Sequence, residues 1–258
     1  MAFSPDYRAQ TGATRGVDSA AVLDVGLRAY MLRVYNWMAS GLVLTGIVAY
    51  GIFASPALFN IFYPLVETAR GPMHVPGGLA WISMFAPLAF VMVLSIGVNR
   101  LSTTAVQALY WAFCVAMGAS LTNIFMIYTH DSIARVFFIS AGTFAAMSLY
   151  GYTTRADLTR FGSFLIMGLF GIIIASLVNM FIGSSAVQFA ISVIGVLVFV
   201  GLTAYDTQRI KSDYVQAVYA YGPDAAAKRS VYDSLQLLLN FINLFMLLLQ
   251  IFGNRNNN

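Results

Sequence analysis

The chain has 258 residues, of which 59% are hydrophobic and only 9% are charged. Soluble domains carry about 25% charged residues, so this composition excludes an ordinary soluble domain. It indicates a protein whose main partner is the lipid bilayer. The net charge of +4 is explained by basic loops that orient a membrane protein, and we expect no nucleic-acid partner.

Uncharged stretches long enough to cross a bilayer recur along the chain, since a span needs about 20 apolar residues. The stretch 161–205 would measure about 67 Å as one helix, against a hydrocarbon core of about 30 Å. Gly183-Ser-Ser185 predicts a break within it. We therefore predict an all-α integral membrane protein with seven transmembrane helices, near residues 34–53, 79–98, 104–127, 136–152, 162–182, 186–207 and 234–252.

The spans form a single membrane domain, predicted at residues 29–253. Residues 1–28 are expected to be a polar cytoplasmic tail, loose or interfacial, and 254–258 a short tail. The connection 54–78 is rich in Pro and Gly and is predicted to be the long external loop. The stretch 208–230 is predicted to be the long cytoplasmic connection.

Lys and Arg are divided unevenly between alternate connections. If the N-terminus is cytoplasmic, 11 of the 14 basic residues lie inside, namely Arg8, Arg15, Arg28, Arg33, Arg100, Arg155, Arg160, Arg209, Lys211, Lys228 and Arg229. Only Arg70, Arg135 and Arg255 lie outside. The positive-inside rule therefore predicts an N-in, C-out orientation.

Asp206 differs from the other acidic residues because it lies inside the end of a membrane-length apolar stretch. The others fall in tails or connections or, for Asp233, at the edge of a segment. A charged group at membrane depth costs roughly 2.5 to 3.5 kcal/mol on insertion scales, so Asp206 is a candidate for ion or proton chemistry. The alternative is a boundary residue that pairs with Arg209 at i+3, worth a few tenths of a kcal/mol.

The last span carries a polar stripe, with Gln236, Asn240 and Asn243 at i, i+4 and i+7. Such side chains are expected to face the bundle interior or a hydrated cavity rather than lipid. We therefore predict that the last helix is central in the bundle. The alternative is that these residues only bond neighbouring helices together, at about 0.6 kcal/mol per contact.

Enzyme motifs do not occur in the sequence, which has no H-E-x-x-H, no G-x-S-x-G and no paired cysteines. Its two histidines, His74 and His130, fall in predicted external loops far apart in the chain. We expect neither enzymatic activity nor a cofactor.

Four segments resemble the Bax inhibitor-1 family, the membrane proteins with the transmembrane Bax-inhibitor motif. They are Tyr30-Met-x-x-Val-Tyr-Asn-Trp-Met38, Ala145-Ala-Met-Ser-Leu-Tyr-Gly-Tyr-Thr-Thr154, Gly201-Leu-Thr-Ala-Tyr-Asp-Thr-Gln-Arg-Ile-Lys211 and Asn240-Phe-Ile-Asn-Leu-Phe245. The resemblance implies seven helices with the last in the centre. It also implies that an acid of the sixth helix pairs with an acid of the seventh as a pH-sensitive gate. The first acid corresponds to Asp206, but Asn240 holds the second place.

The resemblance implies a calcium or cation leak influenced by pH, with Ca²⁺ or H⁺ as the transported or regulatory ion. Asp206 would be the gate and sensor and Asn240 its hydrogen-bond partner, with Tyr205, Gln236, Asn243 and Arg209 in support. Repulsion between two adjacent carboxylates raises the pKa of one of them, which can then titrate near neutrality. An Asp–Asn pair lacks this repulsion and should respond to pH more weakly or at more acidic pH. As a metal ligand Asp206 is weak, since Ca²⁺ takes six to eight oxygens.

Two other functions remain open. The resemblance also allows a non-conducting regulator that binds a membrane protease, another membrane protein or a stress-response protein. A proton-coupled transporter is a third class. The segment 253–258 lacks a strongly basic cluster, and we expect a multi-pass protein of the bacterial inner membrane.

Overall fold

The computed structural model describes residues 7–68, 71–97, 101–221 and 225–256. Within them, seven helical segments are long and apolar enough to cross a membrane: Asp24–Ala54, Gly78–Gly97, Thr103–Ile127, His130–Thr153, Thr159–Ile182, Ser185–Gln216 and Ala227–Phe252. Each contains or overlaps one predicted span, so the predicted all-α membrane fold is confirmed. Residues 1–6 and 257–258 of the two predicted tails, and Arg70 and Arg100 of the charge count, lie outside the described residues.

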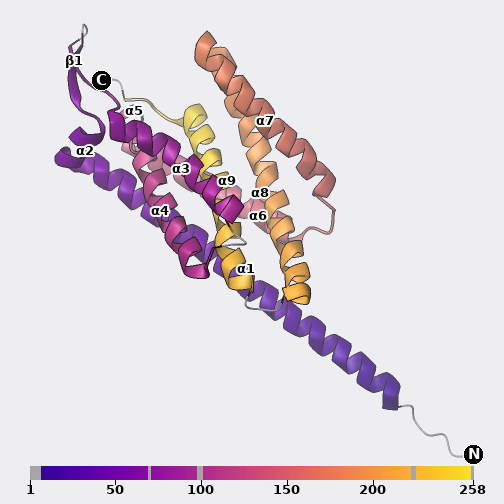
Figure 1. The fold of residues 1–258 in the computed structure, drawn as a ribbon. Helices are drawn as coiled ribbons and strands as arrows, with labels where there is room; N and C mark the ends of the chain where they lie inside the picture. The colour runs from indigo at the N-terminus through magenta and orange to yellow at the C-terminus, as the bar shows by residue number, and fades with distance from the viewer. Residues whose placement is uncertain (1–6, 69–70, 98–100, 222–224, 257–258) are drawn as a thin grey trace, which may run out of the picture.

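In the part of the chain that the structure describes, the helices follow one another with one small hairpin among them (Figure 1). In order they are α1 (Tyr7–Ala54), α2 (Pro56–Phe62), β1 (Leu65–Thr68), β2 (Gly71–His74), α3 (Gly78–Gly97), α4 (Thr103–Leu121), α5 (Ile124–Ile127), α6 (His130–Thr153), α7 (Thr159–Ile182), α8 (Ser185–Tyr221) and α9 (Ala225–Phe252). β1 and β2 pair antiparallel. The predicted external loop therefore contains a short helix and a hairpin.

The break predicted in the long apolar stretch lies between α7 and α8. Gly183 ends α7 with a φ of +67°, and its N–H donates to the carbonyl oxygen of Asn179 at 2.7 Å. A left-handed residue closes a helix in this way, and glycine adopts that conformation without steric cost. α8 begins at Ser185, so the long apolar stretch is divided into two spans as predicted.

Both polar segments are more helical than expected. α1 is helical from Tyr7, where a loose or interfacial tail was expected, and Figure 1 shows its first turns projecting from the bundle. The predicted connection 208–230 is mostly helical, because α8 continues to Tyr221 and α9 begins at Ala225. Charged residues mark where a helix leaves the membrane, not where it ends. Pairs at helical spacing, such as Asp206–Arg209 and Arg229–Asp233, favour its continuation.

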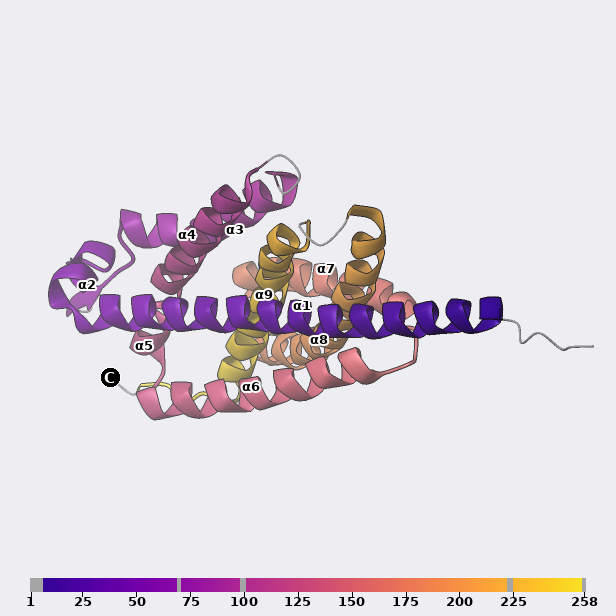
Figure 2. The ribbon, with the colours of Figure 1, turned by 90° about the horizontal axis from the view of Figure 1, so that it is seen from below.

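α9 is the most enclosed of the seven spans. It packs against α1, α4, α6 and α8, and 61% of its span is buried, compared with 44% for α8 and 17% for α7. Figure 2 shows it between α1 and the other helices of the bundle. These contacts support the prediction that the last helix is central.

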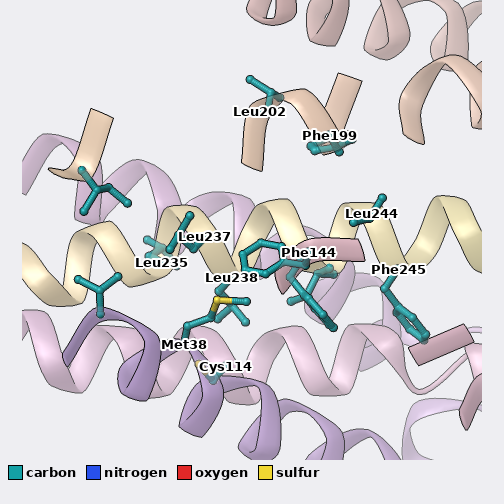
Figure 3. Close-up of a cluster of buried hydrophobic side chains, with 14 of the residues drawn as sticks. Met38, Cys114, Phe144, Phe199, Leu202, Leu235, Leu237, Leu238, Leu244 and Phe245 are labelled. Carbon is teal, nitrogen blue, oxygen red and sulfur yellow. The ribbon is translucent and has the colours of Figure 1, made fainter. Parts of the chain in front are cut away.

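The apolar core is built around α9 (Figure 3). Its leucine and phenylalanine side chains meet residues of four other helices, among them Met38 of α1, Cys114 of α4, Phe144 of α6, and Phe199 and Leu202 of α8. Two glycines allow close approach to α8: a Cβ at Gly151 of α6 would collide with the backbone of Ala204, and one at Gly162 of α7 with the ring of Tyr205. α6 and α7 are thereby held against the stretch of α8 that precedes Asp206.

Candidate functional site

Asp206 lies on α8 with 2% of its surface exposed. Its Oδ2 accepts a hydrogen bond from Nδ2 of Asn240 on α9 at 2.7 Å. Its Oδ1 lies 3.0 Å from Nη2 of Arg209, one turn further along α8. Both carboxylate oxygens are therefore engaged, as a buried charge requires. Asp206 thus makes both contacts that the sequence offered as alternatives, the hydrogen bond with Asn240 and the ion pair with Arg209.

Three of the predicted supporting residues, Tyr205, Arg209 and Gln236, lie next to this contact. The guanidinium of Arg209 lies over the ring of Tyr205, 5.8 Å from its centroid. The side chain of Gln236, one turn before Asn240, also lies near the Asp206 carboxylate. About a third of the Arg209 side chain is exposed, so the buried carboxylate is connected to the surface through a single cation.

Asn243 does not belong to this cluster, contrary to the prediction. It is exposed, whereas Asn240 is buried with 4% exposure. Three residues turn a helix by about 300°, so Asn243 points about 60° away from Asn240 around α9, onto an exposed face. The stripe meets α8 again at Gln250, whose Oε1 accepts hydrogen bonds from Gln188 and Ser192, both at 2.8 Å.

A second acid, Asp233, is also buried, although the sequence placed it at a segment's edge. It is 3% exposed, and its Oδ2 accepts a hydrogen bond from the hydroxyl of Tyr30 on α1 at 2.5 Å. Arg229 lies between two acids, with Nε 3.9 Å from Asp233 and Nη2 2.6 Å from Asp213. A tyrosine, an arginine and two acids therefore join α1, α8 and α9 at this level.

Two sequence features could have indicated this second cluster. Arg229 and Asp233 stand at i and i+4, the spacing of a helical ion pair. Tyr30 is the first residue of the segment that resembles the family. Neither feature gives the pairing itself, since Tyr30 and Asp233 are 203 residues apart.

A chain of hydroxyl groups connects three helices beside Asp206. The Tyr35 hydroxyl of α1 lies 2.5 Å from Ser148 Oγ of α6, which lies 2.9 Å from Thr207 Oγ1 of α8. Thr207 follows Asp206 directly and donates to the carbonyl oxygen of Thr203 at 2.8 Å. All three hydroxyl residues fall in the segments that resemble the family, and this contact was not predicted.

Replacing Tyr30 with phenylalanine is expected to lower the thermal stability of the purified protein. The change removes the donor to a buried carboxylate, which costs about 1 to 3 kcal/mol. Thermal unfolding in detergent measures the effect. Tyr50→Phe is the matched control, since Tyr50 lies on the same helix with 53% exposure. Adding Asp233→Leu to Tyr30→Phe removes both partners and should recover part of the loss; equal melting of Tyr30→Phe and Tyr50→Phe would contradict the assignment.

The site offers little to a tightly bound metal ion. Within the described ranges, no three His, Cys, Asp or Glu side chains gather in one place. In the arrangement seen here, the Asp206 oxygens are engaged by Asn240 and Arg209. A cation that binds Asp206 would have to displace Asn240 or Arg209.

Seven membrane-length helices with buried carboxylates at one end of the bundle define a multi-pass α-helical membrane protein. The family model described as "Inhibitor of apoptosis-promoting Bax1" matches residues 27–257. The chain belongs to the Bax inhibitor-1 family, as its four segments predicted. This is a family of membrane proteins and not a known enzyme family.

Bacterial proteins match the chain over nearly its full length. It is 44% identical to a protein of Rickettsia prowazekii over 90% of the chain and 92% of that protein. It is 43% identical to a protein of Caulobacter vibrioides over 90% of each. It is 42% identical to the inner membrane protein YbhL of Escherichia coli K12, over 92% of the chain and 97% of YbhL. With the seven spans, these relatives confirm a multi-pass protein of the bacterial inner membrane.

Proposed function

We propose that the protein is a pH-influenced calcium or cation leak whose closed state is held at Asp206. The observation that carries the proposal is the buried contact of Asp206 with Asn240 and Arg209. This contact bridges α8 and α9, the most enclosed span. A titratable group between two packed helices is suited to control whether they separate.

The sign of the pH response follows from the contacts. The ionised carboxylate accepts a charge-assisted hydrogen bond from Asn240 and pairs with Arg209. Bonds of this kind are roughly twice as strong as neutral ones. Protonation of Asp206 removes the ion pair and weakens the bond to Asn240. The closed contact is therefore lost as pH falls, and the leak increases.

The ion path would be hydrated and of low affinity. One carboxylate with neighbouring amide oxygens does not provide the six to eight oxygens of a Ca²⁺ site. We therefore expect other cations to pass as well as Ca²⁺, and protons to act as the regulatory ion.

The alternative is a non-conducting regulator that binds another membrane protein, such as a protease or a stress-response component. α7 favours it, because only 17% of its span is buried and a partner helix could pack on its surface. The polar clusters would then serve to hold the bundle together. A proton-coupled transporter is less favoured and would show uptake that depends on a substrate.

The two main functions are separated by Ca²⁺ flux into dye-loaded liposomes between pH 5 and pH 8. We expect flux above that of protein-free liposomes, increasing as pH falls. K⁺ flux in the same vesicles tests the expected lack of calcium selectivity. No flux at any pH, together with a membrane protein that co-purifies, would reject the leak and favour the regulator.

A further inference from the structure

A groove of about 620 Å³ opens between α1 and α6, and Phe241 of α9 forms part of its floor. Both helices pack on α9, and Figure 2 shows the middle of α1 beside the C-terminal part of α6. Ala39, Ala141 and Ala145 line the groove, and their small side chains leave the space open. The volume lies within the range of about 300 to 1,000 Å³ that is usual for ligand sites.

The groove has the length of one lipid leaflet. On α1 its lining runs from Arg28 to Leu42, about 21 Å at 1.5 Å per residue. A bilayer with its headgroup regions is about 40 to 45 Å thick, so one leaflet measures about 20 to 22 Å. Both walls belong to membrane-spanning segments. The groove is therefore long enough to extend from headgroup depth to the middle of the membrane.

The two ends of the groove differ in charge. Arg28 lines one end together with Tyr152, and Nζ of Lys211 lies 5.0 Å from the centroid of the Tyr152 ring. Arg28 is exposed, and among the described residues no carboxylate forms an ion pair with it. The other end, at Leu42 and Ala141, is apolar.

The polar side chains deeper in the groove are already satisfied. The hydroxyls of Tyr35 and Ser148 bond to each other at 2.5 Å, and Ser148 also bonds to Thr207. Buried polar groups that are paired in this way do not require a polar ligand. The floor can therefore accept a hydrocarbon chain.

From this length, charge and lining, we propose that the groove binds an anionic phospholipid. One acyl chain lies along Met38, Ala145 and Phe241, and the phosphate meets Arg28 at the basic end, with Lys211 nearby. Such a site recognises the chain and the negative headgroup together, and so differs from a site for free phosphate. The inference does not depend on whether the protein conducts ions.

Native mass spectrometry of the detergent-purified protein, titrated with phosphatidylglycerol or phosphatidylcholine, tests the proposal. Arg28→Gln should reduce the preference for phosphatidylglycerol about fivefold, as expected for one basic side chain at an anionic surface. Its control is Arg135→Gln, an exposed arginine on α6 outside the groove. Ala145→Leu fills the groove and should weaken binding of both lipids, whereas Ala146→Leu, an exposed neighbour outside the lining, should not.

Circular dichroism of the helices and thermal unfolding show whether each variant is folded. If Ala145→Leu does not fold, Ala141→Leu serves as a second variant that fills the groove. Glycerol phosphate should not displace the lipid; complete displacement would indicate an anion site instead. Equal lipid binding by both groove-filling variants, Ala146→Leu and the native protein would overturn the proposal. A dimer that dissociates in Ala145→Leu while lipid binding is retained would assign the groove to a second copy of the chain.

Discussion

Replacing Asp206 with alanine should raise Ca²⁺ leak at pH 7 to 8 and flatten its dependence on pH. The change leaves the buried amide of Asn240 and the guanidinium of Arg209 without the carboxylate that now joins them. Losing such a partner costs about 1 to 3 kcal/mol. If that cost falls on the closed state alone, the ratio of open to closed protein rises about five- to 150-fold.

Asp206→Asn separates charge from shape. The amide keeps the size of the carboxyl group and can still bond to Asn240, but it cannot pair with Arg209. It should therefore behave at every pH as the protonated native protein behaves at low pH. Flux into liposomes between pH 5 and pH 8 measures all three proteins in parallel.

Asp157→Ala is the matched control for these variants. Asp157 is exposed in the connection between α6 and α7. The hydroxyl and backbone N–H of Thr159 hydrogen-bond to its carboxylate and hold its pKa below the ordinary value, so it stays ionised over this pH range. Its loss should leave the pH profile unchanged. Equal flux in Asp206→Ala and the native protein would remove Asp206 from the mechanism, and abolished flux would assign it to the ion path instead of the closed contact.

Asn240→Asp should move the pH response toward neutrality. The new carboxylate would lie about where the Asn240 amide now stands, 2.7 Å from Asp206. Two carboxylates at this distance cannot both be ionised, so one retains a proton to higher pH. We expect the pH of half-maximal flux to rise by roughly one to three units, by comparison with known carboxylate pairs.

Asn243→Asp is the control for this change. It adds the same charge to the same helix, three residues further along, but at an exposed position. Its pH profile should match that of the native protein. Identical profiles for Asn240→Asp and the native protein would show that Asn240 does not set the pH response, even if Asp206 remains necessary.

The membrane fold could be predicted because bilayer thickness limits the length of a span. The stretch 161–205 was too long for one helix, and Gly183 supplied the break that the structure shows. The polar ends of helices could not be predicted in the same way. Hydropathy reports where a chain leaves the lipid, and α8 continues as a helix beyond that point to Tyr221.

The candidate site was only partly predictable. Asp206 was identified from its place in an apolar stretch, Asn240 from the polar stripe, and both from family resemblance; their contact is present. Asn243 was assigned to the interior by helical spacing. Spacing shows which residues share a face of the helix, but not how much of that face a neighbouring helix covers. Asp233 was missed because its burial depends on Tyr30 of α1, and a contact between the two ends of the chain has no local pattern.

The length of α8 has a mechanical consequence. The helix does not stop where the membrane does, so Asp206 stands partway along a rigid rod of 37 residues. The arm from Asp206 to Tyr221 measures about 22 Å at 1.5 Å per residue. A tilt of about 10° around Asp206 would displace the far end of that arm by about 4 Å. A proton gained or lost at Asp206 could thus move the end of α8 well outside the bilayer, where a soluble protein could bind that end and respond to its position.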